Sequence, residues 1–176
     1  MHLTSLKDCR LAIGNYPFFT YDATGGGGNA SVIDNEKTKC SFLKFDPKKF
    51  YIPPLSGKTA KILGLPMLPG LEIKMVLGKL EGVLDTKNGE IILDFEARFI
   101  LQILKRLRFP DLIIKTQLKS GEVNSRLHKV KGQNKSEDGS TKLVGVAIVP
   151  PSGNKFLDMF LGLPNEALAI LECRIQ

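Results

Sequence analysis

The most regular hydrophobic pattern in the chain runs from residue 91 to residue 103. Every odd position of this segment is apolar. The even positions include four polar residues: Asp94, Glu96, Arg98 and Gln102. Successive side chains of a β-strand point to opposite faces, so this alternation predicts a strand with one buried face and one wet face. Phe95 and Phe99 fall on the face predicted to be buried.

A second apolar segment, Leu71 to Asp85, precedes this strand. Asn88-Gly89 lies between the two segments, and this dipeptide is the strongest short signal for a β-hairpin. We therefore expect the two segments to pair with each other. The apolar phase of the first segment shifts near Gly78, which predicts a bulge or a bend at that point.

Shorter alternating or β-branched runs predict further strands on both sides of this hairpin. They cover residues 10–13, 16–21, 38–45, 112–118, 123–130, 143–149 and 167–175. Seven to nine strands joined mostly by short loops predict a mainly β (α+β) fold, an antiparallel barrel or a strongly curled sheet. The run Gly25–Gly28 predicts a flexible turn, because the Gly-Lys-Ser/Thr of a phosphate-binding loop does not follow it.

Two segments of the chain repeat one another. Residues 52–66 read IPPLSGKTAKILGLP, and residues 149–164 read VPPSGNKFLDMFLGLP. In each copy Pro-Pro ends a strand, and the serine that follows can cap a helix. The Leu-Gly-Leu-Pro motif then stops that helix. We expect two short helices inside a strand–helix–strand echo at about residues 41–85 and 141–176 of a single domain, residues 1–176.

The second of these expected helices is strongly apolar. Phe156, Met159 and Phe160 accompany three leucines, and only Lys155 and Asp158 are charged. Three interpretations are open: a plug at the end of the β core, a lid over an apolar cavity, or a helix that dips into a bilayer surface.

Composition and charge narrow the class of protein. The chain has 176 residues, of which 43% are hydrophobic and 24% charged, so it can bury a core without a metal or disulfide. The net charge of +7 indicates attraction to polyanions or anionic membranes, but strand edges also carry lysine for solubility alone. The one tight basic cluster is Lys105, Arg106 and Arg108. Aromatic residues total 7% without tryptophan, which does not favour nucleic-acid binding.

Few residues are candidates for metal or covalent chemistry. The three cysteines are scattered without a Cys-x-x-Cys pair, so we interpret them as reduced, buried thiols. The two histidines, His2 and His128, have no second ligand at metal-binding spacing, so we expect no metal and no cofactor. Charged residues interrupt the start of the chain, so we expect a cytoplasmic or plastid stromal protein.

Carboxylates on the predicted hairpin offer one route to catalysis. Glu81, Asp94 and Glu96 lie on its two strands and include a possible acid–base pair. Asp94 and Glu96 share a face with Arg98, however, and a salt-bridged surface explains that arrangement better.

Three stretches resemble a known group of sequences: YPFFTYDATGGGG (16–28), ILGLPMLPGLEI (62–73) and FLGLPNEALAIL (160–171). Together they resemble an uncharacterised protein family of cyanobacteria and plastid-bearing organisms. The resemblance implies a cyanobacterial cytoplasm or a chloroplast, and it implies no activity and no functional residue.

These observations leave three hypotheses, of which we prefer the first. The chain is a non-enzymatic module that binds an apolar small molecule or lipid in a barrel-like cavity, with these lining or lid residues: Phe95, Phe99, Phe156, Met159 and Phe160. Alternatively, it is a scaffold or assembly factor that contacts a protein or an anionic membrane through Lys105, Arg106 and Arg108. The third hypothesis is an enzyme that uses the strand carboxylates.

Overall fold

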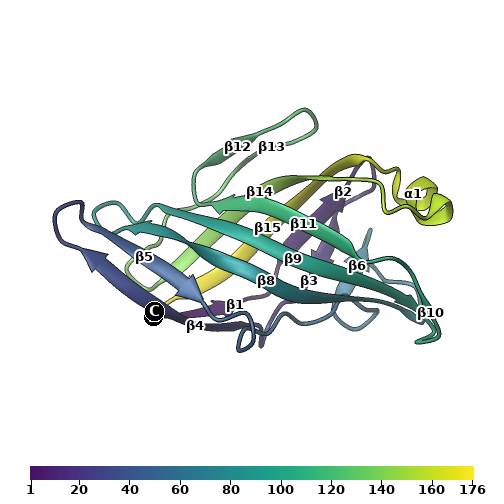
Figure 1. Ribbon diagram of the computed structural model, residues 1–176, viewed down its shortest axis with the longest axis horizontal. Helices are drawn as coiled ribbons and strands as arrows, with labels where there is room; N and C mark the ends of the chain where they lie inside the picture. Colours follow the sequence, from purple (N-terminus) through teal and green to yellow (C-terminus); the bar gives the residue numbers. More distant parts are fainter.

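The computed structural model describes residues 1–176 and consists almost entirely of antiparallel strands (Figure 1). Its strands are β1 (His2–Ser5), β2 (Cys9–Ile13), β3 (Phe19–Tyr21), β4 (Gly27–Asn35), β5 (Cys40–Phe45), β6 (Ala60–Ile62), β7 (Leu65–Pro66), β8 (Leu71–Asp85), β9 (Ile91–Ile103), β10 (Leu107–Arg108), β11 (Leu112–Lys119), β12 (Glu122–Asn124), β13 (Lys129–Lys131), β14 (Ser140–Val149) and β15 (Asn165–Ile175). The one helix, α1, spans Lys155–Leu161. The predicted mainly β class is therefore confirmed.

Eight of the strands form a ring. Their order is β1-β4-β5-β8-β9-β11-β14-β15, and β15 pairs with β1 to close it. The closing seam sets Leu3 opposite Ile175. The ring is not a regular barrel, because β11 and β14 share one register pair, Lys119 with Val144, and the first half of β15 pairs with β2 instead of β1. The prediction of a curled antiparallel sheet is confirmed.

The β8–β9 hairpin is the longest element of the ring and matches its prediction closely. Its strands have the predicted bounds, and Asn88 accepts a hydrogen bond from the Glu90 amide at 2.8 Å within the turn. Gly89 adopts a φ of 72°, which glycine tolerates without strain. The pairing register shifts between Leu77 and Lys79, so the bulge predicted at Gly78 is also confirmed.

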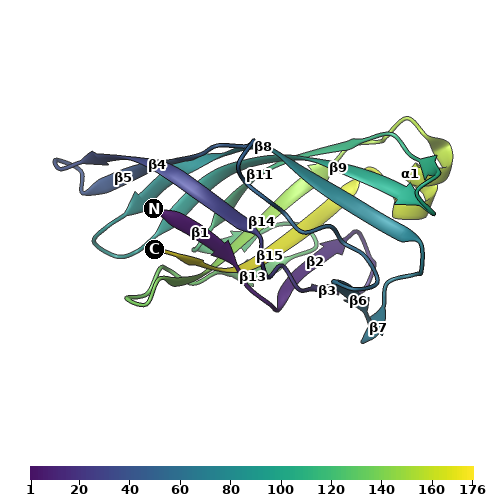
Figure 2. The ribbon, with the colours of Figure 1, turned by 90° about the horizontal axis from the view of Figure 1, so that it is seen from below.

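A smaller branch leaves the ring at β15. The branch has the strand order β2-β3-β6-β7. Its first strand, β2, pairs with residues Ala167 to Ile170 in the first half of β15. A single bridge from Leu55 to Ile73 ties the segment before β6 back to the start of β8. The branch therefore folds toward the ring on the side where β8 begins (Figure 2).

Apolar side chains form three clusters. The first lies near the β1–β15 seam and includes Leu3, Leu93 and Ile175, all fully buried. The second lies under the branch around Tyr21 and Met67. The third lies under α1 and includes these residues: Leu101, Phe109, Leu112, Val149 and Leu157. In both views the chain termini lie away from α1, so the first and third clusters occupy different ends of the molecule (Figures 1 and 2).

The two copies of the internal echo fold differently, and the prediction of a first helix is wrong. In the second copy Asn154 caps α1 by accepting from the Leu157 amide at 3.0 Å, and Gly162 ends it with a φ of 67°. In the first copy Ser56 accepts from the Ala60 amide in one turn, after which Ala60–Ile62 becomes a strand. The first copy is two residues shorter between its Ser-Gly and Gly-Leu-Pro motifs, so a capped helix does not fit.

Two further sequence predictions are corrected. Residues 123–130 are not one strand, because β12 and β13 form a separate hairpin around a turn at Ser125–His128. The glycine run is only partly a turn, because Gly27 and Gly28 begin β4. A Cβ on Gly27 would lie 1.9 Å from the Leu3 carbonyl oxygen. Glycine is needed there because β4 and β1 approach closely.

Candidate functional site

A band of half-buried apolar residues lies on the inner face of the ring. Cross-strand partners share a face of the sheet, and Phe95 lies opposite the buried Leu80. Phe99 lies opposite Met75 on one side and the buried Leu112 on the other. Although they point inward, Phe95, Phe99 and Met75 all retain accessible surface.

The opposite wall of the ring shows the same pattern. Ala169 and Leu171 lie on the face of β15 that also carries the fully buried Cys173, and both are only half-buried. Leu171 packs against both the first and the second apolar clusters, whereas Ile73 packs against both the second and the third. The three clusters are thus joined through half-buried apolar side chains. Phe95 also lines an open hollow together with six polar residues, among them Lys79 and Lys115. We call this set the inner band: Ile73, Met75, Phe95, Phe99, Ala169 and Leu171.

Helix α1 covers the third cluster with one side only. Leu157 is its one fully buried residue, and Leu161 packs against the same cluster. Phe156, Met159 and Phe160 are exposed, Met159 to 77%. The structure therefore separates the five predicted ligand residues into two groups. Phe95 and Phe99 belong to the inner band, whereas the three helix residues lie on the outer surface and do not line the interior.

The exposed aromatic side chains of α1 continue across neighbouring loops. Phe156 stacks between Phe109 and Phe160, with ring centroids 5.9 and 6.2 Å away. Tyr16 lies 6.2 Å from Phe160 and donates a hydrogen bond to its carbonyl oxygen. This row of rings fixes α1 against the β2–β3 loop and against the segment after β10, so these three segments are linked by aromatic contacts.

The predicted basic cluster lies at the β9–β10 turn, at the same end as α1 (Figure 1). Lys105 and Arg106 are exposed and make no salt bridge. Arg108 differs, because it donates to both Asp111 carboxylate oxygens at 2.9 and 3.1 Å. Two of the three predicted cations are therefore free to meet an external anion.

The strand carboxylates lie on the outer face and are paired with lysines. Lys79 lies 3.1 Å from Glu81 and 3.5 Å from Asp94, and Lys115 lies 2.9 Å from Glu96. Hydrogen bonding to Lys79 lowers the pKa of Glu81. These pairs of an ionised carboxylate and a lysine form the salt-bridged surface that the sequence pattern favoured.

The β12–β13 hairpin folds over the outer face of the ring, an arrangement the sequence did not reveal. Its tip is anchored on the buried carboxylate of Glu166, which accepts from Ser125 Oγ at 2.8 Å and from the amides of Leu127 and Arg126 at 3.1 and 3.2 Å. Desolvation alone would raise the pKa of Glu166, but these hydrogen bonds outweigh it and lower the pKa. The only sequence signal was one acidic residue at the start of an apolar strand.

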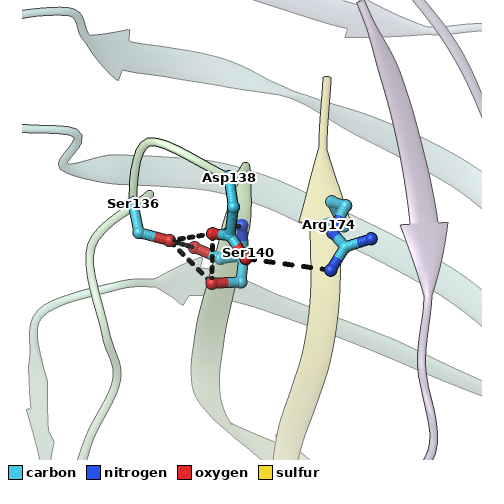
Figure 3. A network of polar contacts seen from close by, with 4 residues as sticks. All are labelled: Ser136, Asp138, Ser140 and Arg174. Carbon is cyan, nitrogen blue, oxygen red and sulfur yellow. Dashed lines mark hydrogen bonds and ion pairs between the residues drawn. The ribbon is translucent and has the colours of Figure 1, made fainter.

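A serine-rich turn near the seam forms the densest polar network (Figure 3). Asp138 accepts from Ser136 Oγ at 2.6 Å and from Ser140 Oγ at 2.8 Å, and Arg174 approaches it at 3.7 Å. Hydrogen bonding, foremost from Ser136, lowers the pKa of Asp138. An ionised aspartate cannot serve as a proton donor, and no histidine adjoins these serines, so the network stabilises the turn that leads into β14.

Cys9 and Cys173 are buried as the sequence predicted, whereas Cys40 is only half-buried. All three cysteines are free, and burial raises the pKa of Cys9 to about 11, which keeps the thiol protonated and unreactive. Burial also raises the pKa of Cys173. No group of three or more potential ligands is placed to hold a metal ion.

Comparisons of the chain with protein-family models, curated proteins and solved structures find no match. The resemblance to a cyanobacterial and plastid family therefore stays a prediction. The sole helix, with seven residues, is too short to cross a bilayer.

Proposed function

We propose that the protein binds an apolar small molecule or a lipid chain inside its ring of strands. One observation carries the proposal: the inner band is apolar, points inward and yet remains accessible between three separate clusters. In a domain with one continuous core, side chains in these positions bury each other fully. The half-buried residues of the inner band supply the apolar surface that such a ligand would cover.

The size of the ring supports this function. Eight antiparallel strands enclose an interior that side chains just fill or that holds one small ligand. On one wall the inward side chain of Ala169 is only a methyl group, between Gly145 on β14 and Leu11 on β2. Aromatic and thioether side chains supply the other wall, through Phe95, Phe99 and Met75. Such a surface selects a ligand by shape and apolar area.

Burial of the ligand supplies the free energy of binding. Each methylene group removed from water contributes about 0.8 kcal/mol before the costs of association are subtracted. The buried wall near the band offers few polar groups, because its cysteine thiols stay protonated at neutral pH. We therefore expect uncharged or acyl-chain ligands.

A matched pair of substitutions tests whether the inner band is open. Ala169→Leu adds apolar atoms at a half-buried inward position, whereas Ala97→Leu adds them at an inward position that is 1% exposed. Overpacking a filled core costs roughly 1–3 kcal/mol. We expect that cost for Ala97→Leu only, and unchanged or higher stability for Ala169→Leu, measured by urea denaturation.

The same two variants report on binding. A fluorescent fatty acid titrated into the wild-type protein should bind, and Ala169→Leu should weaken binding by about tenfold because it occupies the ligand's space. Native mass spectrometry of the wild type should also show a retained ligand. Equal destabilisation of both variants, together with no fatty-acid binding by the wild type, would overturn the proposal.

A further inference from the structure

The end of the molecule that carries α1 exposes many apolar side chains. They stand on the β2–β3 loop, the β6–β7 hairpin with the loop after it, the β9–β10 turn and α1, and they include Phe18, Leu63, Leu65, Leu104, Leu107 and Met159. Both views place α1 and β6 at the same end of the long axis (Figures 1 and 2). We call this surface the helix end.

Two exposed leucines occupy turn tips whose backbone conformation is unfavourable for leucine. Leu63 and Leu104 both adopt a φ of 52°, in the left-handed region that glycine and asparagine occupy most easily, and they are 78% and 69% exposed. Each leucine is unfavourable on two counts, through its backbone conformation and through its apolar surface in water. Strained residues of this kind cluster at functional surfaces.

The tips are held in place by the rest of the fold. The Leu104 amide donates to the Gly70 carbonyl oxygen at 2.7 Å, which joins the β9–β10 turn to the loop that precedes β8. The row of rings from Phe109 through α1 to Tyr16 joins the other two segments. The exposed leucines therefore project from a supported surface.

Basic residues outnumber acidic residues at the helix end. Four basic residues of these segments make no salt bridge: Lys61, Lys105, Arg106 and Lys155. The two carboxylates of the same segments both accept hydrogen bonds from neighbouring groups. Asp111 is held by Arg108 and lies 3.5 Å from Arg98, and Asp158 accepts from the Ser152 amide at 2.7 Å.

We propose that the helix end docks on the surface of an anionic lipid bilayer. Apolar tips that reach the acyl boundary, surrounded by unpaired lysine and arginine, match the chemistry of that surface. A second copy of the chain would meet the helix end with the same positive charge. Protein–protein interface cores are depleted of lysine, so a protein partner fits the pattern less well. The docking does not depend on whether the ring interior holds a ligand.

Both kinds of side chain set the strength of docking. Each unpaired Lys or Arg near an anionic surface contributes about fivefold to partitioning, and this contribution weakens as salt screens the surface. Each leucine that enters the acyl boundary contributes about tenfold or more. Weak binding through charge alone is therefore strengthened by the two turn tips.

Vesicle flotation tests the apolar contribution. Vesicles of equal parts phosphatidylcholine and phosphatidylglycerol should bind the wild-type chain at low salt, and vesicles of phosphatidylcholine alone should bind it far less. Leu63→Asn combined with Leu104→Asn should lower partitioning by more than about tenfold while Tm stays equal or rises, because asparagine tolerates a positive φ. Ile33→Thr removes an exposed apolar side chain from β4, outside the helix end, and should leave partitioning unchanged.

A second pair of variants tests the charge. Lys105→Gln with Arg106→Gln should lower partitioning by about twentyfold, whereas Lys37→Gln with Lys39→Gln, on the β4–β5 turn, should change it little. Absence of wild-type binding to both vesicles, or unchanged binding of the double asparagine variant, would overturn the proposal. A concentration-dependent dimer that the asparagine variant loses would also overturn it, by identifying a second copy as the occupant.

Discussion

The two ends of the ring use the same residue types in opposite ways. At the seam of β1 and β15, leucine and isoleucine side chains are fully buried in the first cluster. At the helix end, leucine, phenylalanine and methionine stand in water, and only Leu157 of α1 is fully buried. Burial of apolar surface is the dominant favourable term in folding. We therefore expect the seam end to be the more stable part of the fold, whereas the helix end exposes apolar surface to other molecules.

The largest expected effect is at the seam end. Leu93 is fully buried in the first cluster, opposite Leu118 and Gly82 on the neighbouring strands. Leu93→Ala removes apolar contacts and leaves a cavity, so it should lower the free energy of unfolding by about 3–5 kcal/mol in urea denaturation. A loss below about 1 kcal/mol would show that the seam end is not the stable end.

A smaller effect is expected for the one buried residue of α1. Leu157→Ala should cost about 2–3 kcal/mol, because a short surface helix relaxes into the space more easily than a closed ring does. The variant should also detach α1, which hydrogen exchange of the Leu157 and Asp158 amides would report as lost protection. The exposed Met159 supplies the control, since Met159→Ala should change stability by less than about 0.5 kcal/mol.

The smallest expected effect concerns the anchored hairpin and is confined to acid pH. The folded state lowers the pKa of Glu166, so its carboxylate contributes stability above the ordinary glutamate pKa and loses it as pH falls through the lowered value. Protection of the Arg126 and Leu127 amides from hydrogen exchange should fall over that range. Glu166→Gln should flatten the pH dependence, and an unchanged pH profile in this variant would contradict the assignment.

Local patterns predicted the middle of the fold and missed its closure. The segment from Leu71 to Ile103 was correct in bounds, turn and bulge, because alternation and Asn88-Gly89 are encoded within a few residues. The short β1 and the glycine-led β4 lack such a pattern. Their places depend on partners far along the chain, such as Ile175 opposite Leu3.

The candidate site was likewise only half visible in the sequence. Strand alternation identified Phe95 and Phe99 as inward-facing. The face on which a strand residue lies follows from the alternation itself, without knowledge of the tertiary structure. The three apolar helix residues were ambiguous, since nearly every side of α1 is apolar and only its packing through Leu157 distinguishes inside from outside. Leu63 and Leu104 were not singled out, although leucine within a hairpin turn was the available signal.

The position of the seam has a consequence for biosynthesis. Residues 2–5 pair with residues 26–29 and with residues 173–176, so the ring cannot close until residues 173–176 have left the ribosome. Until β15 has been synthesised, β1 and β14 each have an unpaired edge, and this edge exposes backbone hydrogen-bonding groups to other nascent chains. The high sequence separation of these contacts also predicts slow folding. The order of the strands therefore predicts a period during synthesis in which exposed strand edges are available to chaperones.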